Sequence, residues 1–194
     1  MTKNYLKMYA KSFNWAGFFL PKKIYKKCSS LYDFCRTIDD IADQELTLDI
    51  KIEQFKQFKV SFTNKDFNNQ IIKNMHELID NTGISKKVVY DLFDGVESDL
   101  KNEVKINTKK ELLIYSYRVA GTVGLMMAKI LKVKKQNALK AAIDLGIAMQ
   151  LTNIARDVVE DNANNRKYIE LNFESIKSTI IIADSFYKSS FSSI

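Results

Sequence analysis

Two pairs of aspartates with the same four-residue spacing are the residues of this chain that could do chemistry. Asp39 and Asp43 lie in RTIDDIAD, and Asp157 and Asp161 lie in TNIARDVVED. Four residues are about one turn of an α-helix, so both carboxylates of a pair face the same way. Like charges in that arrangement destabilise a helix by roughly 0.2–0.5 kcal/mol, which predicts a cation between the pairs. Hard divalent metal ions, which prefer oxygen ligands, are the obvious candidates.

Polar side chains accompany the second aspartate pair along one stripe of the same predicted helix. Gln150, Asn153, Asp157 and Asp161 follow one another at steps of three, four and four residues, and their neighbours are largely apolar. An amide oxygen and two carboxylates would suit Mg²⁺. Arg156 lies beside them and could hold a phosphate through two parallel hydrogen bonds. This stripe therefore predicts a site for a metal ion together with a phosphate.

The first aspartate pair also has polar company. Arg36 stands three residues before Asp39, and Tyr32 stands one helical turn before Arg36. A solvated acidic face is the simpler interpretation of any single acidic pair at this spacing. Three other pairs are assigned to the surface on that ground: Glu45/Asp49, Asp99/Glu103 and Glu170/Glu174. The two aspartate pairs with arginines and amides in register favour a functional site instead.

The bulk composition is that of one ordinary domain with a sizeable core. The chain has 194 residues, of which 46% are hydrophobic, and it contains one proline and six glycines, a pattern that favours long helices. Its net charge of +7 comes from scattered lysines, which could meet nucleic acid, anionic lipid or phosphorylated ligands or could simply solvate helix surfaces. No nucleic-acid-binding motif accompanies them, so no nucleic-acid partner is expected.

Histidine and cysteine content argues against several other classes of protein. His76 is the only histidine, which argues against His-ligated zinc and a Ser-His-Asp triad. His76 and Glu77 also lack the Glu-x-x-His spacing of carboxylate-bridged di-iron bundles. The two cysteines, Cys28 and Cys35, predict a reducing compartment. The polar start of the chain and the absence of an apolar run of ~18 residues predict a cytoplasmic protein without a signal peptide.

Apolar residues recur at steps of three and four almost throughout, which predicts an all-α fold over residues 1–194 as one domain. Thr108 and Glu111 have capping-box spacing at the start of one helix, and Gly121 and Gly124 within it predict a kink or a close approach. The predicted helices lie near Asn4–Phe19, Lys22–Asp43, Asp49–Thr63, Asp66–Asp80, Ser85–Asn102, Thr108–Leu131, Lys134–Asn162 and Phe173–Ser190.

Six segments of the chain resemble the squalene and phytoene synthases, which join two prenyl diphosphates head to head. The segments are KSF, FLPKK, YDFCRTIDDIAD, LFDGVESDL, YSYRVAGTVGLMMA and LGIAMQLTNIARDVVEDNANNRKYI. They extend from about Lys11 to Tyr168, and VAGTVGLMMA is most similar to bacterial phytoene synthases. The resemblance implies an isoprenoid-synthase-type helical bundle around a central cavity.

The resemblance also implies a role for individual residues. Two or three Mg²⁺ ions that bridge to diphosphate would be bound by Asp39, Asp43, Asn153, Asp157 and Asp161. The diphosphate would be held or oriented by Ser12, Tyr32, Arg36, Gln150 and Arg156. Tyr117 matches a tyrosine placed near the reacting carbons and joins the four aspartates as a catalytic residue. Tyr168 matches the family's Arg-x-Tyr-Leu segment, although an ordinary tyrosine at a helix end is an equally good interpretation.

The implied reaction is Mg²⁺-dependent condensation of two geranylgeranyl diphosphates to phytoene, through a cyclopropyl diphosphate, in carotenoid biosynthesis. Farnesyl diphosphate as substrate, giving dehydrosqualene or squalene, is the alternative. No G-x-G-x-x-G sequence is present, so NADPH is not expected. The reacting cation needs apolar or aromatic walls. Candidates, most of them equally good core residues, are Phe13, Phe18, Phe19, Phe34, Val119, Leu125, Met126, Met149 and Ile154.

The chain departs from the family pattern at its C-terminal end. Residues 169–194 resemble a compressed remnant of the C-terminal helices, with ADSFYK similar to a segment that lies much further along in relatives. The bundle is therefore expected to be incomplete there. A minimal active synthase, a truncated inactive one, one part of a split enzyme completed by another C-terminal chain, and a non-catalytic prenyl-diphosphate-binding protein all remain open. Weak peripheral contact with the inner membrane is expected, because substrate and product are greasy and the surface is basic.

Overall fold

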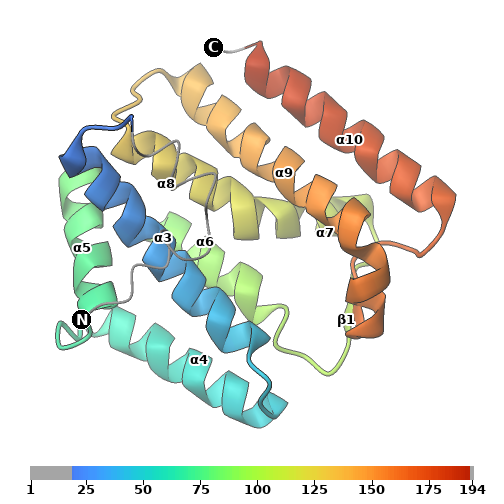
Figure 1. The fold of residues 1–194 in the computed structure, drawn as a ribbon, viewed down its shortest axis with the longest axis horizontal. Helices are drawn as coiled ribbons and strands as arrows, with labels where there is room; N and C mark the ends of the chain where they lie inside the picture. The colour runs from blue at the N-terminus through green and yellow to red at the C-terminus, as the bar shows by residue number, and fades with distance from the viewer. Residues whose placement is uncertain (1–18, 193–194) are drawn as a thin grey trace.

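The apolar periodicity folds the chain into a bundle of helices, as Figure 1 shows for this computed structural model, which describes residues 19–192. The elements, in order, are α3 (Lys22–Asp43), α4 (Leu48–Thr63), α5 (Gln70–Thr82), α6 (Lys86–Glu97), β1 (Val104–Lys105), α7 (Lys109–Ser116), the π-helical turn η1 (Tyr117–Gly121), α8 (Thr122–Ile130), α9 (Gln136–Ala163), β2 (Arg166–Lys167) and α10 (Phe173–Phe191). Helices α9 and α10 run side by side in opposite directions, and α6 and α8 lie between them and the group of α3, α4 and α5. The all-α prediction is confirmed.

Most predicted helices match the structure, and the differences lie at their ends. The helix expected to start at Asp66 starts at Gln70, because the Asn69 side chain caps it by accepting from the backbone N–H groups of Ile71 and Ile72. The helix expected to reach Asn102 ends at Glu97. The predicted first helix, Asn4–Phe19, lies outside the described residues apart from Phe19.

The predicted helix from Thr108 to Leu131 is present in three pieces. The Thr108 capping box forms as expected, with Thr108 accepting from the Glu111 backbone and Glu111 accepting from the Thr108 backbone. The π-turn η1 then adds a wider turn before α8. The predicted close approach is confirmed, because a Cβ on Gly124 would collide with the backbone oxygen of Ala142, and one on Gly146 with that of Ala120.

Two hydrophobic clusters hold the bundle together. The first joins α3, α4, α5, α6 and α8, and at its centre Phe34 meets Phe58, Phe62 and Phe93 with ring centroids 5.6–5.9 Å apart. The second joins α7, α9 and α10 with the segments around β1 and β2. The first cluster anchors α3 and the second anchors α9, so each helix that carries an aspartate pair is packed into its own part of the core.

A two-stranded parallel ladder ties together two segments that follow α6 and α9. Val104 pairs with Arg166, and Lys105 pairs with Lys167. The turn from α9 into β2 needs a left-handed residue, and Asn165 supplies it with φ 58°. Side chains two residues apart in an extended segment point the same way. Arg166 and Tyr168 therefore reach the same side of the chain, toward α3 and α6.

The lengths and compositions of the described helices also bear on membranes. Among residues 19–192, none of the helices combines the length and the apolar character that a bilayer crossing needs.

Candidate active site

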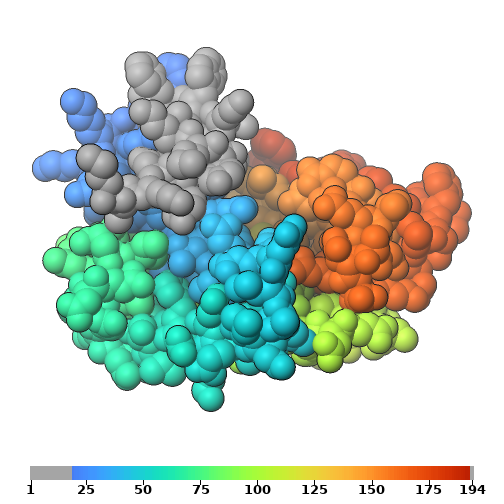
Figure 2. Space-filling view, turned by 60° about the horizontal axis from the view of Figure 1, so that its bottom comes forward, coloured from blue at the N-terminus to red at the C-terminus, as the bar shows by residue number. Residues whose placement is uncertain are grey.

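A pocket opens between α3 and α9, with a volume of about 290 Å³. Figure 2 shows the surface hollowed between the blue of α3 and the orange of α9. The lining residues come from α3, α7, η1, α9, the end of α6 and the β2 segment. They are Asp39, Ala42, Asp43, Val96, Asp99, Tyr115, Val119, Gln150, Asn153, Ile154, Asp157, Asp161, Arg166 and Tyr168.

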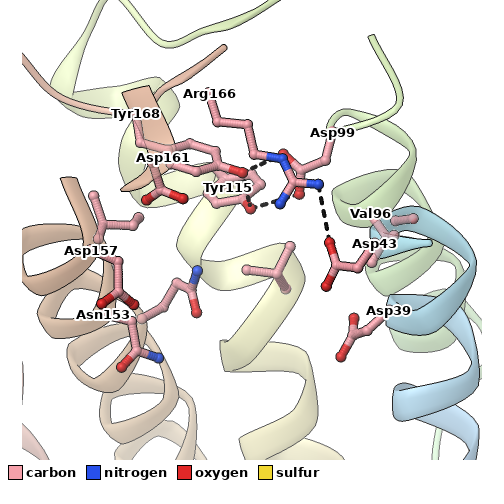
Figure 3. Close-up of a pocket in the computed structure, with 14 residues that line it drawn as sticks. Asp39, Asp43, Val96, Asp99, Tyr115, Asn153, Asp157, Asp161, Arg166 and Tyr168 are labelled. Atoms are coloured by element: carbon pink, nitrogen blue, oxygen red, sulfur yellow. Dashed lines mark hydrogen bonds and ion pairs between the residues drawn. The ribbon is translucent and has the colours of Figure 1, made fainter. Parts of the chain in front are cut away.

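The two aspartate pairs face each other across this pocket. Asp39 and Asp43 project from α3 on one side, and Asn153, Asp157 and Asp161 project from α9 on the other (Figure 3). The structure thus brings together six of the residues singled out from the sequence, with Gln150 as the sixth. Helical spacing alone accounts for each half of the site, because residues four apart share one helix face.

The environment of the aspartates shifts their pKa values in different directions. Burial, with the neighbouring Asp43 carboxylate next in importance, raises the pKa of Asp39 to about 7. Burial likewise raises the pKa of Asp161 to about 6, although the Arg166 guanidinium acts the other way. A hydrogen bond from Arg156 lowers the pKa of Asp157. A cation in the pocket would stabilise the ionised forms of Asp39 and Asp161, whose raised pKa values disfavour ionisation.

A half-buried carboxylate that the sequence analysis assigned to the surface, Asp99, lies at the head of the pocket. Asp99 accepts hydrogen bonds from the hydroxyl of Tyr115 to Oδ2, at 2.7 Å, and from that of Tyr168 to Oδ1, at 2.8 Å. The two tyrosine rings stack with centroids 4.8 Å apart. Burial raises the pKa of Asp99, and its hydrogen bonds with the tyrosines partly offset that rise. The surface assignment of Asp99 was wrong, because folding turns this end of α6 toward Tyr168.

Arg166 is the cation nearest the centre of this group of carboxylates. Its Nη2 atom lies 3.1 Å from Asp43 Oδ1, in an ion pair between β2 and α3. Its charge also offsets part of the rise that burial causes in the pKa values of Asp99 and Asp161. The sequence analysis mentioned Arg166 only beside Tyr168, because the contact with Asp43 spans 123 positions of the chain. A positive charge here is the signal expected of a site built for cations and anions together.

Several residues expected at the site do not line the pocket. Arg36 pairs through Nε with Asp40 Oδ1 at 2.7 Å, and exposed Arg156 holds Asp157 through two hydrogen bonds of 2.6 Å. Tyr32 lies on α3 one turn before Arg36 and is half-buried. Ser12, expected to bind diphosphate, lies outside the described residues.

Tyr117, expected near the reacting carbons, also lies away from the pocket. Its hydroxyl donates to Asp91 Oδ2 at 3.2 Å, while Tyr115 and Val119 line the pocket. Residues two apart on a helix point in nearly opposite directions, and residues four apart share a face. The pocket tyrosine on this helix is therefore Tyr115, which sequence periodicity from Val119 could have identified.

The expected apolar wall residues divide between pocket, core and surface. Val119 and Ile154 line the pocket. Phe34 and Met126 are completely buried in the first hydrophobic cluster and so are core residues. Phe19 and Met149 are exposed, and Leu125 is half-buried. Phe13 and Phe18 lie outside the described residues.

The donor atoms of the pocket fit Mg²⁺ held jointly with a ligand better than a closed protein cage. Within residues 19–192, no three acidic, histidine or cysteine side chains converge on one point as a ready-made metal site. Mg²⁺ characteristically takes one or two carboxylates and completes its shell with water and phosphate oxygens. Two facing carboxylate pairs with an amide, all hard oxygen donors, suit that mode of binding.

Comparison with known proteins identifies the family of this chain. Residues 6–170 match the family described as squalene/phytoene synthase. The chain is 30% identical to phytoene synthase of Pseudescherichia vulneris over 174 residues, covering 82% of this chain and 55% of the relative. It is 34% identical to 4,4'-diapophytoene synthase of Staphylococcus haemolyticus over 172 residues, covering 84% of this chain and 59% of the relative. The chain thus spans little more than half the length of these relatives.

Two solved structures have a similar fold. A dehydrosqualene synthase in complex with a ligand superposes with a TM-score of 0.74 at 29% identity, covering 97% of this chain and 74% of that one. The squalene synthase HpnC from Alicyclobacillus acidocaldarius superposes with a TM-score of 0.78 at 15% identity, covering 97% of this chain and 79% of that one. At that identity the second likeness shows the fold alone.

Proposed function

Because the chain belongs to the squalene/phytoene synthase family, we propose that its pocket binds two prenyl diphosphates and joins them head to head. The observation that carries the proposal is the placement of two aspartate pairs on opposite walls of one pocket, with an arginine between them. The relatives named phytoene synthase and 4,4'-diapophytoene synthase support it.

The carboxylates and the amide of the pocket would hold Mg²⁺ together with diphosphate. Asp39 and Asp43 would bind from α3, and Asn153, Asp157 and Asp161 would bind from α9. Bound Mg²⁺ would neutralise the charge of the diphosphate and make it a better leaving group. Gln150 lines the same stripe of α9 and would orient the diphosphate by hydrogen bonding.

Three arginines near the pocket are already paired with carboxylates, and we propose that they exchange those partners for diphosphate. Arg36 pairs with Asp40, Arg156 with Asp157, and Arg166 with Asp43. Two of these partners are proposed metal ligands. A carboxylate that binds a cation attracts a guanidinium less strongly, which would leave Arg156 and Arg166 free to hold an anion through parallel hydrogen bonds.

The inner walls of the pocket would protect the reacting carbons from water. Val119 and Ile154 supply apolar surface, and the stacked rings of Tyr115 and Tyr168 supply aromatic surface. A carbocation formed by loss of diphosphate reacts with water unless water is excluded, and an aromatic ring nearby stabilises positive charge. Asp99 would keep both tyrosines in place through its two hydrogen bonds. Tyr115 would take the place near the reacting carbons that sequence analysis assigned to Tyr117.

For the product we propose phytoene, formed from two geranylgeranyl diphosphates in carotenoid biosynthesis. The name of the Pseudescherichia vulneris relative supports this choice. The name of the Staphylococcus haemolyticus relative supports the shorter alternative, in which farnesyl diphosphate gives a dehydrosqualene-type product.

A second candidate function follows from length and exposed surface together. The chain corresponds to 55% of one curated relative and 59% of another, and α10 exposes several large apolar side chains, among them Phe173, Ile180 and Ile181. We propose that the remaining helices of the relatives, in this polypeptide or in a complementing C-terminal chain, cover this face. Without them the chain would bind prenyl diphosphate in the presence of Mg²⁺ but would not turn it over.

Incubation of the purified chain with geranylgeranyl or farnesyl diphosphate and Mg²⁺ tests both candidates. A C40 or C30 hydrocarbon among the extracted products supports the synthase. Mg²⁺-dependent binding of diphosphate without product, lost in Asp39→Asn, supports the binding protein. Absence of any Mg²⁺-dependent binding contradicts both.

A further inference from the structure

Lysines gather at the end of the bundle that lies opposite the pocket. Four helix ends lie in a row there, along the upper left edge of Figure 1: the start of α3, the end of α8, the start of α9 and the end of α10. The hydrogen bond from Ser189 on α10 to Asp144 on α9, at 2.7 Å, is one of the contacts that hold them together. This end, called the basic end below, carries the exposed lysines Lys22, Lys23, Lys26, Lys132, Lys134, Lys135 and Lys140.

The charge of the basic end is not neutralised by neighbouring acidic groups. No aspartate or glutamate occurs from Phe19 to Tyr32 or from Leu112 to Ile143. Among the described ion pairs, none involves a lysine of the basic end. Within residues 19–192, the nearby carboxylates are buried Asp144, which accepts from Ser189, Asp184, which is paired with Lys188 at 2.6 Å, and exposed Asp80 near the end of α5.

The basic end and the acidic pocket are too far apart to neutralise each other. Helix α3 has 22 residues and α9 has 28, so these helices are about 33 and 42 Å long at 1.5 Å per residue. Lysines stand in the first turn of α3 and directly before α9, and aspartates stand near the last turn of each helix. The screening length at physiological ionic strength is about 8 Å, so each end presents its own field to a partner.

Two helix starts reinforce the positive field of the basic end. Helices α3 and α9 begin without a side-chain cap and without an acidic residue in the first turn. The start of a helix carries partial positive charge, so Lys22 and Lys23 stand where a lysine is unfavourable. An anionic surface alongside would turn that unfavourable placement into an attraction.

Large apolar side chains stand among these lysines. Phe19 precedes α3 and is 73% exposed, Leu131 follows α8 and is 46% exposed, and Phe191 ends α10 and is 70% exposed. Lysines alone would suit any polyanion. Lysines with protruding aromatic and aliphatic side chains suit a lipid surface, where the charges meet headgroups and the apolar groups enter the interface.

We propose that the basic end docks on an anionic lipid membrane, with the pocket at the far end of α3 and α9. This docking goes beyond the proposed reaction and does not depend on turnover. Each lysine near an anionic surface strengthens binding about fivefold, so the loss of three lysines should weaken it by about 100-fold.

Sedimentation with vesicles tests the proposal on the full chain. Vesicles of phosphatidylcholine with about one third phosphatidylglycerol should bind the chain, more weakly as salt is raised, and pure phosphatidylcholine vesicles should not. The variant Lys132→Glu/Lys134→Glu/Lys135→Glu should bind about 100-fold more weakly. A matched control, Lys56→Glu/Lys101→Glu/Lys105→Glu, makes the same change of charge at exposed sites away from the basic end and should bind much better than that variant. Leu131→Gln with Phe191→Gln should weaken binding at unchanged charge.

Three results would overturn the proposal. They are no binding to the anionic vesicles, equal losses in the two triple variants, and binding to a DNA duplex but not to vesicles. Circular dichroism of each variant checks that it is folded. Mg²⁺-dependent diphosphate binding, measured without lipid, should be the same in both triple variants, so a failure of docking is distinguishable from a failure of the proposed function.

Discussion

Asp39 and Asp43 on α3 have the same spacing as Asp157 and Asp161 on α9, yet the protein around the two pairs differs. The α3 pair is held from across the pocket, since Asp43 is paired with Arg166 of β2 and burial is the main cause that raises the pKa of Asp39 to about 7. In the α9 pair, Asp157 is neutralised by the adjacent Arg156, which lowers its pKa. Spacing therefore places two carboxylates on one face of each helix, while the surroundings decide which of these carboxylates is ionised in the absence of a cation.

The largest expected effect tests whether both aspartate pairs bind metal. Asp39→Asn and Asp157→Asn should each weaken Mg²⁺-dependent diphosphate binding by about 100-fold or more, because each removes a charged oxygen ligand from a site with few of them. Isothermal titration with inorganic diphosphate and Mg²⁺ measures this. Asp80→Asn, which changes an exposed carboxylate on α5, is the control and should bind normally. A variant of either pair that binds like the control would mean that its helix takes no part.

Tyr115 and Tyr117, two residues apart, allow a comparison between a tyrosine that lines the pocket and one that does not. Tyr115→Phe removes a short hydrogen bond from a buried tyrosine to the Asp99 carboxylate and should lower the free energy of unfolding by about 1.5–3 kcal/mol. Tyr117→Phe removes a longer, part-buried bond between two half-buried residues, Tyr117 and Asp91, and should cost less than about 1 kcal/mol. Urea denaturation of the two variants gives both values. Equal effects would contradict the assignment of Tyr115 as the pocket tyrosine.

Arg166 and Arg156 provide a test, with smaller expected effects, of the difference between the α3 pair and the α9 pair. Arg166→Ala should lower the free energy of unfolding by about 1–2 kcal/mol, because it removes a half-buried link between β2 and α3 and leaves Asp99 without a nearby cation. Arg156→Ala removes an exposed pair between adjacent residues and should leave stability almost unchanged, because solvent screens such a pair. Thermal denaturation without metal compares them. A larger loss for Arg156→Ala would show that the α9 pair, and not the α3 pair, is tied into the fold.

The pH dependence of stability that Asp39 contributes should be opposite in sign to that of Asp157. Because the pKa of Asp39 is raised to about 7 in the folded chain, the folded state binds its proton more tightly than the unfolded state does. The stabilisation that this proton provides should be complete below about pH 4 and lost as the pH rises through about 7. Asp157 has a lowered pKa, so its smaller contribution is present at neutral pH and lost in acid.

Melting temperatures of the metal-free chain between pH 4 and pH 8 test this difference. Asp39→Asn should flatten the loss of stability toward pH 8, and Asp157→Asn should not. A steeper loss in Asp39→Asn would contradict the origin assigned to the raised pKa.

Much of the fold could be predicted from the sequence, because helix starts, caps and helix faces depend on residues close together in the chain. The start of α3 after Pro21, the capping box at Thr108 and the stripe from Gln150 to Asp161 depend on residues within a turn or two of one another. The close packing at Gly124 was also predicted, although not its partner, since a glycine indicates that something approaches but not what.

The remaining parts of the site depend on contacts between distant segments. The sequence alone indicated a surface position for Asp99, because its hydrogen bonds with Tyr115 and Tyr168 form only in the folded chain. Arg166 meets Asp43 only because the ladder between β1 and β2 turns it toward α3. Tyr117 was chosen because it matches a tyrosine of the family, and it is the packing of this helix that places Tyr115 at the pocket instead.

By itself, the sequence determined the family, the helical character and the spacing of the two aspartate pairs, because helix formation and helix faces follow from neighbouring residues. The tertiary structure alone decided how far each carboxylate is buried, which arginine neutralises it, and which tyrosine reaches the pocket. Burial and charge pairing arise when segments far apart in the chain pack together, and it is this packing that gives two pairs of equal spacing their unequal electrostatics.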